Sequence, residues 1–352
     1  MDRPLPQLDA EAPPPAPDDL HDTGTLQDAH GRTIHDLRLS ITDRCNFRCI
    51  YCMEPEDRFL PKRSLLSADE YLAIVDAAMT LGVRKIRITG GEPTLYPDLD
   101  TLIDELGRRG LDDIAMTTNG WHLNPGRVAG WKASGLQRLT FSLDTLREDR
   151  MATITRSATS VADVLRSIDI AAAEELTHSK INVVAMRGHN EDEYADFADL
   201  ARERELDIRF IEFMPLDSGR SWKPDSVVSE TEIVDAISQR HTLRLRSSHN
   251  PHSTSRHYEF ADGGPGRIGV IASVTRPFCG DCNRLRLTAE GAVRPCLFSN
   301  TEWDIRPLLR SGGTHEDIVR FLVDAVWTKQ AGHSIGRDDF QQPDRIMSAI
   351  GG

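Results

Sequence analysis

Short apolar runs alternate with longer amphipathic stretches between about residue 37 and residue 218. The runs have the length of buried strands and predict six of them, at residues 37–41, 85–89, 113–117, 138–143, 180–185 and 207–213. The stretches between them repeat apolar residues at helical spacing and predict helices, at about residues 67–82, 99–109, 125–134, 161–174 and 191–203. Ser67 and Glu70 match a capping box at the start of the first of these helices.

This alternation predicts an α/β fold of right-handed βαβ units with a parallel sheet. Six repeats fall short of the eight that close a complete barrel. We therefore expect a partial (β/α)6 TIM-type barrel at residues 29–218, with a doubly wound open sheet as the alternative. After residue 218 the alternation stops and turn residues multiply before a last helix at about residues 316–328. Residues 219–352 are expected to form a C-terminal extension that covers the open side of the barrel.

The first 28 residues are rich in Pro, Asp and Ala, with three consecutive prolines at positions 13–15. Such a composition cannot bury a core and predicts a disordered extension. A docking arm is the alternative for residues 1–28.

Composition narrows the class of protein. The net charge of −13 argues against a general nucleic-acid binder, because phosphate contacts need a basic surface. No stretch approaches the roughly 20 apolar residues of a membrane helix, and the first residues lack the apolar core of a signal peptide. We expect a cytoplasmic protein without a membrane or nucleic-acid partner. Six cysteines in such a chain favour metal binding or catalysis over a disulfide framework.

Three of the cysteines, Cys45, Cys49 and Cys52, directly follow the first predicted strand. Active-site loops gather at the carboxyl ends of strands in α/β folds. Three thiolates so close together can hold one face of an iron–sulfur cubane and leave the fourth iron open for chemistry. Structural zinc is the alternative, but it needs a fourth ligand, and none lies nearby in the sequence.

The other three cysteines, Cys279, Cys282 and Cys296, again make a set of three. Their spacing alone leaves both zinc and an iron–sulfur cluster open. Arg284 and Arg286 lie two residues apart, so on an extended strand they share a face. They predict either a fork for a phosphate or a purine edge, or two solvated arginines.

The string Cys-x3-Cys-x-Tyr-Cys after a first strand resembles the signature of the radical S-adenosylmethionine family. Thr89-Gly90-Gly91-Glu92-Pro93, at the end of the second strand, supports the resemblance. It implies a 4Fe–4S cluster on Cys45, Cys49 and Cys52, and S-adenosylmethionine on its open iron. The positions that contact this ligand in related enzymes are here Tyr51, Gly91, Ser142 and Met214.

The segment from Phe278 to Thr288, with Arg294-Pro295-Cys296-Leu297-Phe298, resembles the GTP 3′,8-cyclase family of molybdenum cofactor biosynthesis, and the likeness extends over residues 31–352. It implies a second 4Fe–4S cluster on Cys279, Cys282 and Cys296, with GTP bound beside it. The implied reaction makes (8S)-3′,8-cyclo-7,8-dihydroguanosine 5′-triphosphate, with Arg284 and Arg286 among the catalytic residues. The GTP-contacting positions implied for this chain are Arg38, Arg87, Thr117, Lys180, Arg284, Leu285 and Arg286.

The resemblance also implies partners. These are a reductant such as flavodoxin or ferredoxin, cyclic pyranopterin monophosphate synthase as the next enzyme, and a second copy of the chain in a homodimer. The tail Gly351-Gly352 matches the family, in which it reaches the active site; a frayed end is the alternative. Tyr96 and Arg156 depart from residues that are frequent in relatives. The alternative functions are a peptide-modifying radical enzyme and a non-catalytic, metal-stabilised interaction module.

Overall fold

Six parallel strands and the helices between them form the core of the fold. The computed structural model describes residues 12–121, 123–176, 179–247, 251–338 and 340–351. The strands are β1 Asp36–Ser40, β2 Lys85–Thr89, β3 Asp113–Thr118, β4 Arg138–Ser142, β5 Lys180–Ala185 and β6 Asp207–Glu212. Each pairs in parallel with the next. All six predicted strands are therefore confirmed to within a residue at either end.

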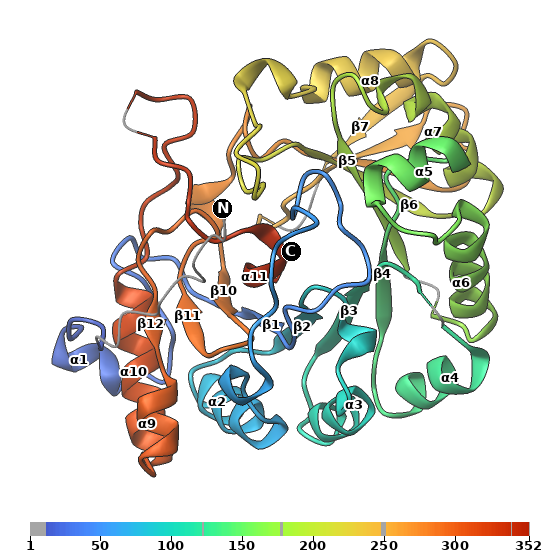
Figure 1. Cartoon of the computed structure of the whole chain (residues 1–352). Helices are drawn as coiled ribbons and strands as arrows, with labels where there is room; N and C mark the ends of the chain where they lie inside the picture. Colours follow the sequence, from blue (N-terminus) through green and yellow to red (C-terminus); the bar gives the residue numbers. More distant parts are fainter. Residues whose placement is uncertain (1–11, 122, 177–178, 248–250, 339, 352) are drawn as a thin grey trace.

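The helices lie outside the curved sheet (Figure 1). They are α2 Ala68–Thr80, α3 Leu99–Gly107, α4 Pro125–Ala133, α5 Glu148–Thr155, α6 Val161–Ala173, α7 Tyr194–Glu203 and α8 Glu230–Ser238. The predicted capping box of α2 is present: the Ser67 hydroxyl accepts from the Glu70 amide, and the Glu70 carboxylate accepts from the Ser67 amide. The sequence pattern did not predict α5 or α8.

Strand alternation separates an apolar face from a polar one. On β1, Leu37 and Leu39 are buried in the large hydrophobic core under the helices. Arg38 between them points to the opposite, inner face, because successive side chains of a strand alternate. On β2, Ile86 and Ile88 are buried in the same core, and Arg87 alternates with them. The helices are thus held by apolar contacts, and the inside of the curved sheet is left to polar side chains.

The C-terminal region extends both edges of this sheet. At the β6 edge it adds β9 Arg267–Ile271, in parallel, then β8 Arg256–Phe260 and β7 Leu243–Arg246. At the β1 edge it adds β10 Arg284–Leu287, in parallel, then β11 Ala292–Arg294 and β12 Trp303–Asp304. The resulting order among the described residues is β12-β11-β10-β1-β2-β3-β4-β5-β6-β9-β8-β7, with no pairing between its two ends. The sheet is an open, partial barrel, as predicted.

The chain then crosses back over the barrel. Helices α9 Arg306–Arg310 and α10 His315–Trp327 follow β12, and α10 packs against α2. The last helix, α11 Met347–Ile350, lies near the centre of the ring in Figure 1, beside the C-terminus. The end of the chain therefore returns to the open side of the barrel.

Part of the segment predicted to be disordered packs on the fold. Leu26 is fully buried, and its amide donates to the Leu81 carbonyl at 3.0 Å. The Ala16 amide donates to Asp324 Oδ1 on α10 at 2.7 Å, and the short helix α1 Asp18–His21 lies beside α10. For residues 16–28 the expectation of disorder is therefore wrong, because isolated contacts anchor a segment that has no periodic pattern of its own. Residues 1–11 lie outside the described residues. Nowhere in the described part of the chain is a helix both long and apolar enough to cross a bilayer.

Candidate active site

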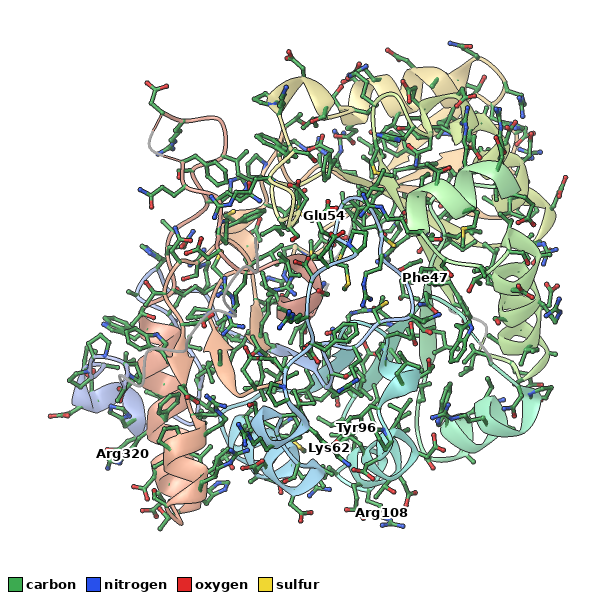
Figure 2. The ribbon with its side chains drawn as sticks, viewed as in Figure 1. Phe47, Glu54, Lys62, Tyr96, Arg108 and Arg320 are labelled. Atoms are coloured by element: carbon green, nitrogen blue, oxygen red, sulfur yellow. The ribbon has the colours of Figure 1, made fainter. Side chains whose placement is uncertain are left out.

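The first cysteine set, Cys45, Cys49 and Cys52, lies on the loop that leaves β1. The amides of Cys52 and Met53 donate to the Cys49 carbonyl at 2.8 and 3.1 Å, so this part of the loop is a tight turn. Two further bonds tie the loop to the end of α5: Arg48 N to Thr155 O at 2.7 Å and Ile50 N to Ile154 O at 3.0 Å. Figure 2 labels Phe47 and Glu54, which flank Cys49 and Cys52, over the middle of the ring.

Burial dominates the chemistry of these thiols. It raises the pKa of Cys45 to about 12 and that of Cys52 to about 11, and it raises the pKa of Cys49 as well. The carboxylate of Glu92 adds to the effect at Cys45, and that of Asp144 adds to it at Cys49. A metal that binds these three sulfurs must therefore displace their protons.

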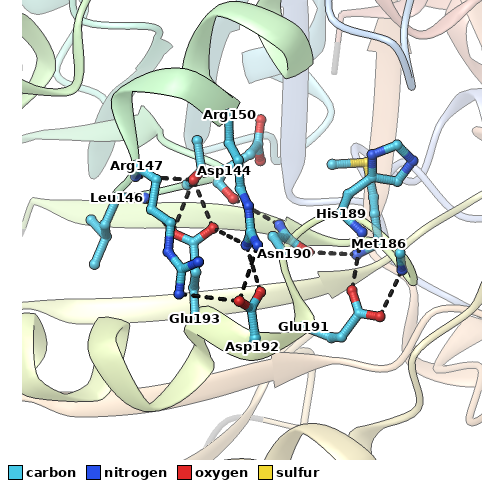
Figure 3. A network of polar contacts seen from close by, with 12 residues as sticks. Asp144, Leu146, Arg147, Arg150, Met186, His189, Asn190, Glu191, Asp192 and Glu193 are labelled. Carbon is cyan, nitrogen blue, oxygen red and sulfur yellow. Dashed lines mark hydrogen bonds and ion pairs between the residues drawn. The ribbon is translucent and has the colours of Figure 1, made fainter.

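Asp144 anchors the residue between two of the cysteines. The Tyr51 hydroxyl donates to Asp144 Oδ2 at 2.8 Å, and the Val184 amide donates to Asp144 Oδ1 at 2.8 Å. Burial raises the pKa of Asp144 to about 6. Asp144 itself lies on the loop after β4, and Figure 3 shows how this loop is held. Asn190 Nδ2 donates to the Asp144 carbonyl at 2.7 Å, beside the buried Glu193. Asp144 was not singled out from the sequence.

The glycine loop after β2 packs directly on the first cysteine loop. The Gly91 amide donates to the Thr42 carbonyl at 2.7 Å, and the Glu92 amide donates to the Arg44 carbonyl at 2.8 Å. A Cβ on Gly91 would lie 2.4 Å from the Arg44 carbonyl oxygen. Gly91 is therefore required for backbone packing, besides any ligand that it contacts.

Glu92, from the same loop, joins the ends of two strands. Its buried carboxylate accepts from Thr118 Oγ1 and from the Asn119 amide, both at 2.7 Å. Asn119 in turn donates to Asn46 Oδ1 at 2.8 Å, next to Cys45. The sequence placed Glu92 in a motif without revealing this bridge from β3 to the cysteine loop.

The second cysteine set, Cys279, Cys282 and Cys296, surrounds the start of β10. Cys279 begins a short 3-10 turn, Cys279–Asp281, Cys282 follows this turn directly, and Cys296 follows β11. Arg284 Nη2 donates to Cys282 Sγ at 3.4 Å. Burial raises the pKa of Cys282, but the positive charges of Arg284 and Lys329 outweigh it and bring the pKa down to about 6. The strongest effect of a neighbouring charge thus differs between the sets: it comes from a carboxylate at Cys45 and Cys49 and from a cation at Cys282.

The predicted GTP residues come together on the inner face of the sheet. Arg38 pairs in register with Arg286 on one side and with Arg87 on the other. Burial lowers the pKa of Arg87 and of Arg286 to about 9, and neighbouring arginines add to it. Arg87 Nη1 donates to Thr140 Oγ1 at 3.2 Å and to Thr117 Oγ1 at 3.5 Å. Buried like charges at this density favour an anionic ligand, which would compensate them.

The same face continues with Lys180, which was predicted to contact GTP, and with Arg138 and Arg209, which were not selected from the sequence. Lys180 on β5 lies 3.5 Å from Asp207 on β6, and Arg209 lies 3.4 Å from the same carboxylate. Burial lowers the pKa of Lys180 to about 8, with Arg209 adding to the shift. Among the described residues, several buried polar atoms on this face have no hydrogen-bond partner, namely Arg138 Nε, Asn182 Oδ1, Arg209 Nε and His257 Nδ1. Because side chains alternate along a strand, the positions two residues after Lys180 and Asp207, which are Asn182 and Arg209, could have been predicted to share this face.

A cavity of about 560 Å³ opens at the amino ends of these strands. Arg138, Lys180, Asp207 and Arg267 are among its lining residues. The cationic face is therefore reachable from the bottom of the barrel.

Three other residues that were predicted to contact a ligand, Ser142, Met214 and Leu285, have different surroundings. Ser142 ends β4 on the inner face, opposite Asn182 of β5. Met214 follows β6 and packs with Cys296, Leu216 and Ile350 in a small cluster between the barrel and the tail. Leu285 is 1% exposed and packs in the helix-side core, so only its backbone can face a ligand.

The C-terminal tail reaches this inner face. Arg286 Nη1 donates to the Gly351 carbonyl at 2.8 Å. Gly351 has a φ of +78°, and a Cβ there would lie 2.4 Å from Thr89 Oγ1, so the position favours glycine. Gly351 is therefore ordered against β2 and β10 rather than frayed. Gly352 lies outside the described residues.

The two departures from the frequent family pattern lie in different places. Tyr96 is buried and makes an edge contact with Tyr71, so it belongs to the core under the helices. Arg156 has a left-handed backbone with a φ of +49°. Its Nη1 donates to Glu54 Oε2 at 3.1 Å, so it holds the loop that follows Cys52. Within the described ranges, no three His, Cys, Asp or Glu side chains are grouped as ligands of one metal ion.

Models of known protein families match both the barrel and the C-terminal region of this chain. The model of the Radical SAM superfamily matches residues 39–201, and that of Molybdenum Cofactor Synthesis C matches residues 206–335. A Streptomyces coelicolor protein named GTP 3′,8-cyclase is 44% identical over 330 residues, which cover 93% of this chain and 96% of that one. A Rhodopirellula baltica protein of the same name is 42% identical over 341 residues, which cover 96% and 94%.

Solved structures resemble the fold at low sequence identity. Streptococcus suis SuiB bound to S-adenosylmethionine has a TM-score of 0.53 at 17% identity and covers 78% of this chain. This chain spans 62% of that longer one. Native anSMEcpe with bound AdoMet has a TM-score of 0.55 at 13% identity, over 85% of this chain and 82% of that one. These likenesses establish a shared fold alone.

Proposed function

The chain belongs to the GTP 3′,8-cyclase family of radical S-adenosylmethionine enzymes, and from this membership we propose the chemistry of its barrel interior. It converts GTP into (8S)-3′,8-cyclo-7,8-dihydroguanosine 5′-triphosphate, the first step of molybdenum cofactor biosynthesis. The observation that carries the proposal is a continuous row of cations on adjacent strands, formed by the buried Arg286 and the half-buried Arg38 and Arg87.

Each cysteine set has the donor composition of a 4Fe–4S cluster with one open iron. Three thiols and no fourth ligand in their sequence neighbourhood are the donor set that such a cluster needs. Under this proposal Cys45, Cys49 and Cys52 hold the first cluster, and Cys279, Cys282 and Cys296 hold the second. When bound, the first cluster and S-adenosylmethionine supply the radical chemistry that removes hydrogen from ribose C3′ and joins that carbon to guanine C8.

The chain's own residues bind and orient the two ligands. Tyr51, Gly91, Ser142 and Met214 would contact S-adenosylmethionine. The loop that carries Tyr51 is held in place by its bond to Asp144. A fixed loop keeps the reacting groups in a constant geometry, which contributes to the rate.

The triphosphate is compensated by charge on the inner face. Arg38, Arg87, Lys180 and Arg286 provide the cations, Thr117 a hydroxyl and Leu285 its backbone, while Arg284 lies beside the second cysteine set. Buried guanidinium groups bind phosphate oxygens with paired, charge-assisted bonds. The tail at Gly351 covers this face and helps to exclude water from the reaction.

The proposal includes several points beyond the reaction itself. A flavodoxin or ferredoxin would supply the electron, cyclic pyranopterin monophosphate synthase would take the product, and the chain would act in the cytoplasm as a homodimer. The barrel would comprise residues 29–218 and the C-terminal region residues 219–352. The relatives named GTP 3′,8-cyclase favour this reaction over the peptide-modifying and the non-catalytic alternatives.

The test is anaerobic turnover. Reconstituted protein, incubated with GTP, S-adenosylmethionine and dithionite, should form 5′-deoxyadenosine and a cyclised nucleotide, both detected by mass spectrometry. Cys45→Ser, Cys49→Ser and Cys52→Ser should abolish both products. The pair Arg284→Ala and Arg286→Ala should abolish the nucleotide product and leave some cleavage of S-adenosylmethionine.

Arg108→Ala is the matched control, because Arg108 is an exposed arginine at the end of α3 that pairs with Asp104 and Glu105 of the same helix. It should leave both products unchanged. Formation of 5′-deoxyadenosine without any cyclised nucleotide, by wild-type protein with two clusters, would contradict the proposed substrate.

A further inference from the structure

Residues 329–333, which follow α10, form a strap that passes beside the second cysteine set. Lys329 is 3% exposed, and its Nζ donates to the Arg284 carbonyl at 2.8 Å and also to the Pro295 carbonyl. Arg284 begins β10, two residues after Cys282, and Pro295 directly precedes Cys296. One buried ammonium thus joins the two chain segments that carry these cysteines.

The strap also contacts the third cysteine. Gly332 lies so near that a Cβ on it would be 3.2 Å from Cys279 Cβ and 3.5 Å from its sulfur. The His333 ring makes an edge contact with Phe298, at 5.0 Å between centroids, two residues after Cys296. All three cysteine-bearing segments therefore converge on five consecutive residues.

A second buried cation fixes the strap itself. Arg32 donates to three backbone carbonyls: Cys279 at 2.7 Å, Ala331 at 2.9 Å and Gln330 at 2.7 Å. Asp28, whose side chain is fully buried, pairs with Arg32 Nε at 2.6 Å and orients the guanidinium. The segment before β1 is therefore part of the support of the second cysteine set.

We infer that residues 329–333, with Lys329 as the positioning residue, form the outer shell that assembles and tunes the second cysteine set. The inference rests on the proposed function, because it takes this set to hold an iron–sulfur cluster. Hydrogen bonds to cluster sulfurs and nearby charge set the reduction potential of such clusters. A buried cation stabilises the more negative, reduced state, so Lys329 raises the potential. Its bond to the Arg284 carbonyl also holds the arginine that is proposed to contact GTP.

The test is a redox titration of the reconstituted protein, followed by electron paramagnetic resonance, with anaerobic GTP binding measured in parallel. Lys329→Met should shift the midpoint potential of the second cluster to more negative values and weaken GTP binding. We expect a GTP affinity about tenfold lower, equal to the smaller losses of metal affinity or activity that outer-shell changes cause. Lys329→Arg, which keeps the charge, should restore the potential in part. The first-cluster signal should stay unchanged in both variants.

Gly332→Ala is a second, milder variant. It presses a methyl group on Cys279 and should alter the spectrum of the second cluster alone. Lys132→Met is the control, since Lys132 lies on α4 and pairs with the exposed Glu175. It should match wild type in every measurement.

The outcomes separate this inference from the proposed function. Wild-type potential and GTP affinity in folded Lys329→Met and Gly332→Ala, each with two clusters, would overturn the inference. If Lys329→Met does not fold, a wild-type spectrum and potential of the second cluster in Gly332→Ala would overturn it. Wild-type protein that reconstitutes with only one cluster would instead contradict the proposed function.

Discussion

Gly91→Ala tests whether the glycine loop is needed for packing on the first cysteine loop. The added methyl group would lie 2.4 Å from the Arg44 carbonyl oxygen and 2.6 Å from the Asp43 carbonyl oxygen. Both atoms are backbone, so the strain cannot be relieved by turning a side chain. The two loops must separate.

The cost follows from the contacts that separation would break. Overpacking a tight site costs about 1–3 kcal/mol. The bonds from the Gly91 amide to Thr42 and from the Glu92 amide to Arg44 would stretch, each with a loss of about 1 kcal/mol. We expect the free energy of unfolding to fall by about 3–5 kcal/mol in all.

The assay is urea unfolding of the iron-free protein, with the iron content of the reconstituted protein as a second readout. Gly130→Ala is the matched control, because Gly130 lies inside α4 and a Cβ there has nothing within 4 Å. It should stabilise the protein by about 0.5–1 kcal/mol, since alanine favours a helix over glycine. If Gly91→Ala unfolds within about 0.5 kcal/mol of wild type and takes up full iron, the packing argument fails.

Four further predictions follow from other contacts. Leu26→Ala should lower the free energy of unfolding by about 2–5 kcal/mol in urea titrations, because Leu26 is fully buried although it lies in the segment expected to be disordered; an unchanged midpoint would contradict this. Arg345→Met should lower the free energy of unfolding by about 3–5 kcal/mol, because Glu290 and Glu302 lose their common partner. Arg310→Met, at the surface, should lower it by about 1 kcal/mol or less. GTP affinity should fall as pH rises through about 8, the lowered pKa of Lys180, because the neutral amine no longer attracts phosphate. Calorimetric titrations should show this loss at higher pH in Lys180→Arg. Arg87→Met should weaken GTP binding at least tenfold in equilibrium dialysis, because it removes a cation from the inner face, and binding equal to wild type would remove Arg87 from the site.

The barrel could be predicted because its signal is local. Each of β1 to β6 is an apolar run that repeats after an amphipathic helix, and the capping box at Ser67 and Glu70 fixed the start of α2. The strands of the C-terminal region carry no such signal. β10 is four residues long and includes Arg284 and Arg286, and its partner β1 is remote in sequence, so only tertiary contact makes it a strand.

The candidate site also contains residues that could be predicted from the sequence and residues that could not. The cysteine spacings and the residues at strand ends could be read directly, and the structure brings Arg38, Arg87 and Arg286 together in register. Supporting residues could not be found, because their roles depend on distant partners. Lys329 acts through carbonyls of β10 and the Cys296 segment, and Asp144 through the hydroxyl of Tyr51.

The strand order has a consequence for how the chain folds. β1 is synthesised early, yet its neighbour β10 follows roughly 250 residues later, and contacts of such sequence separation slow folding. Until β10 arrives, one side of β1 presents unpaired backbone groups, which can pair with other chains. A protein released before its last strands are made would carry the first cysteine loop on an unfinished edge. We therefore expect truncated products to aggregate rather than to retain partial function.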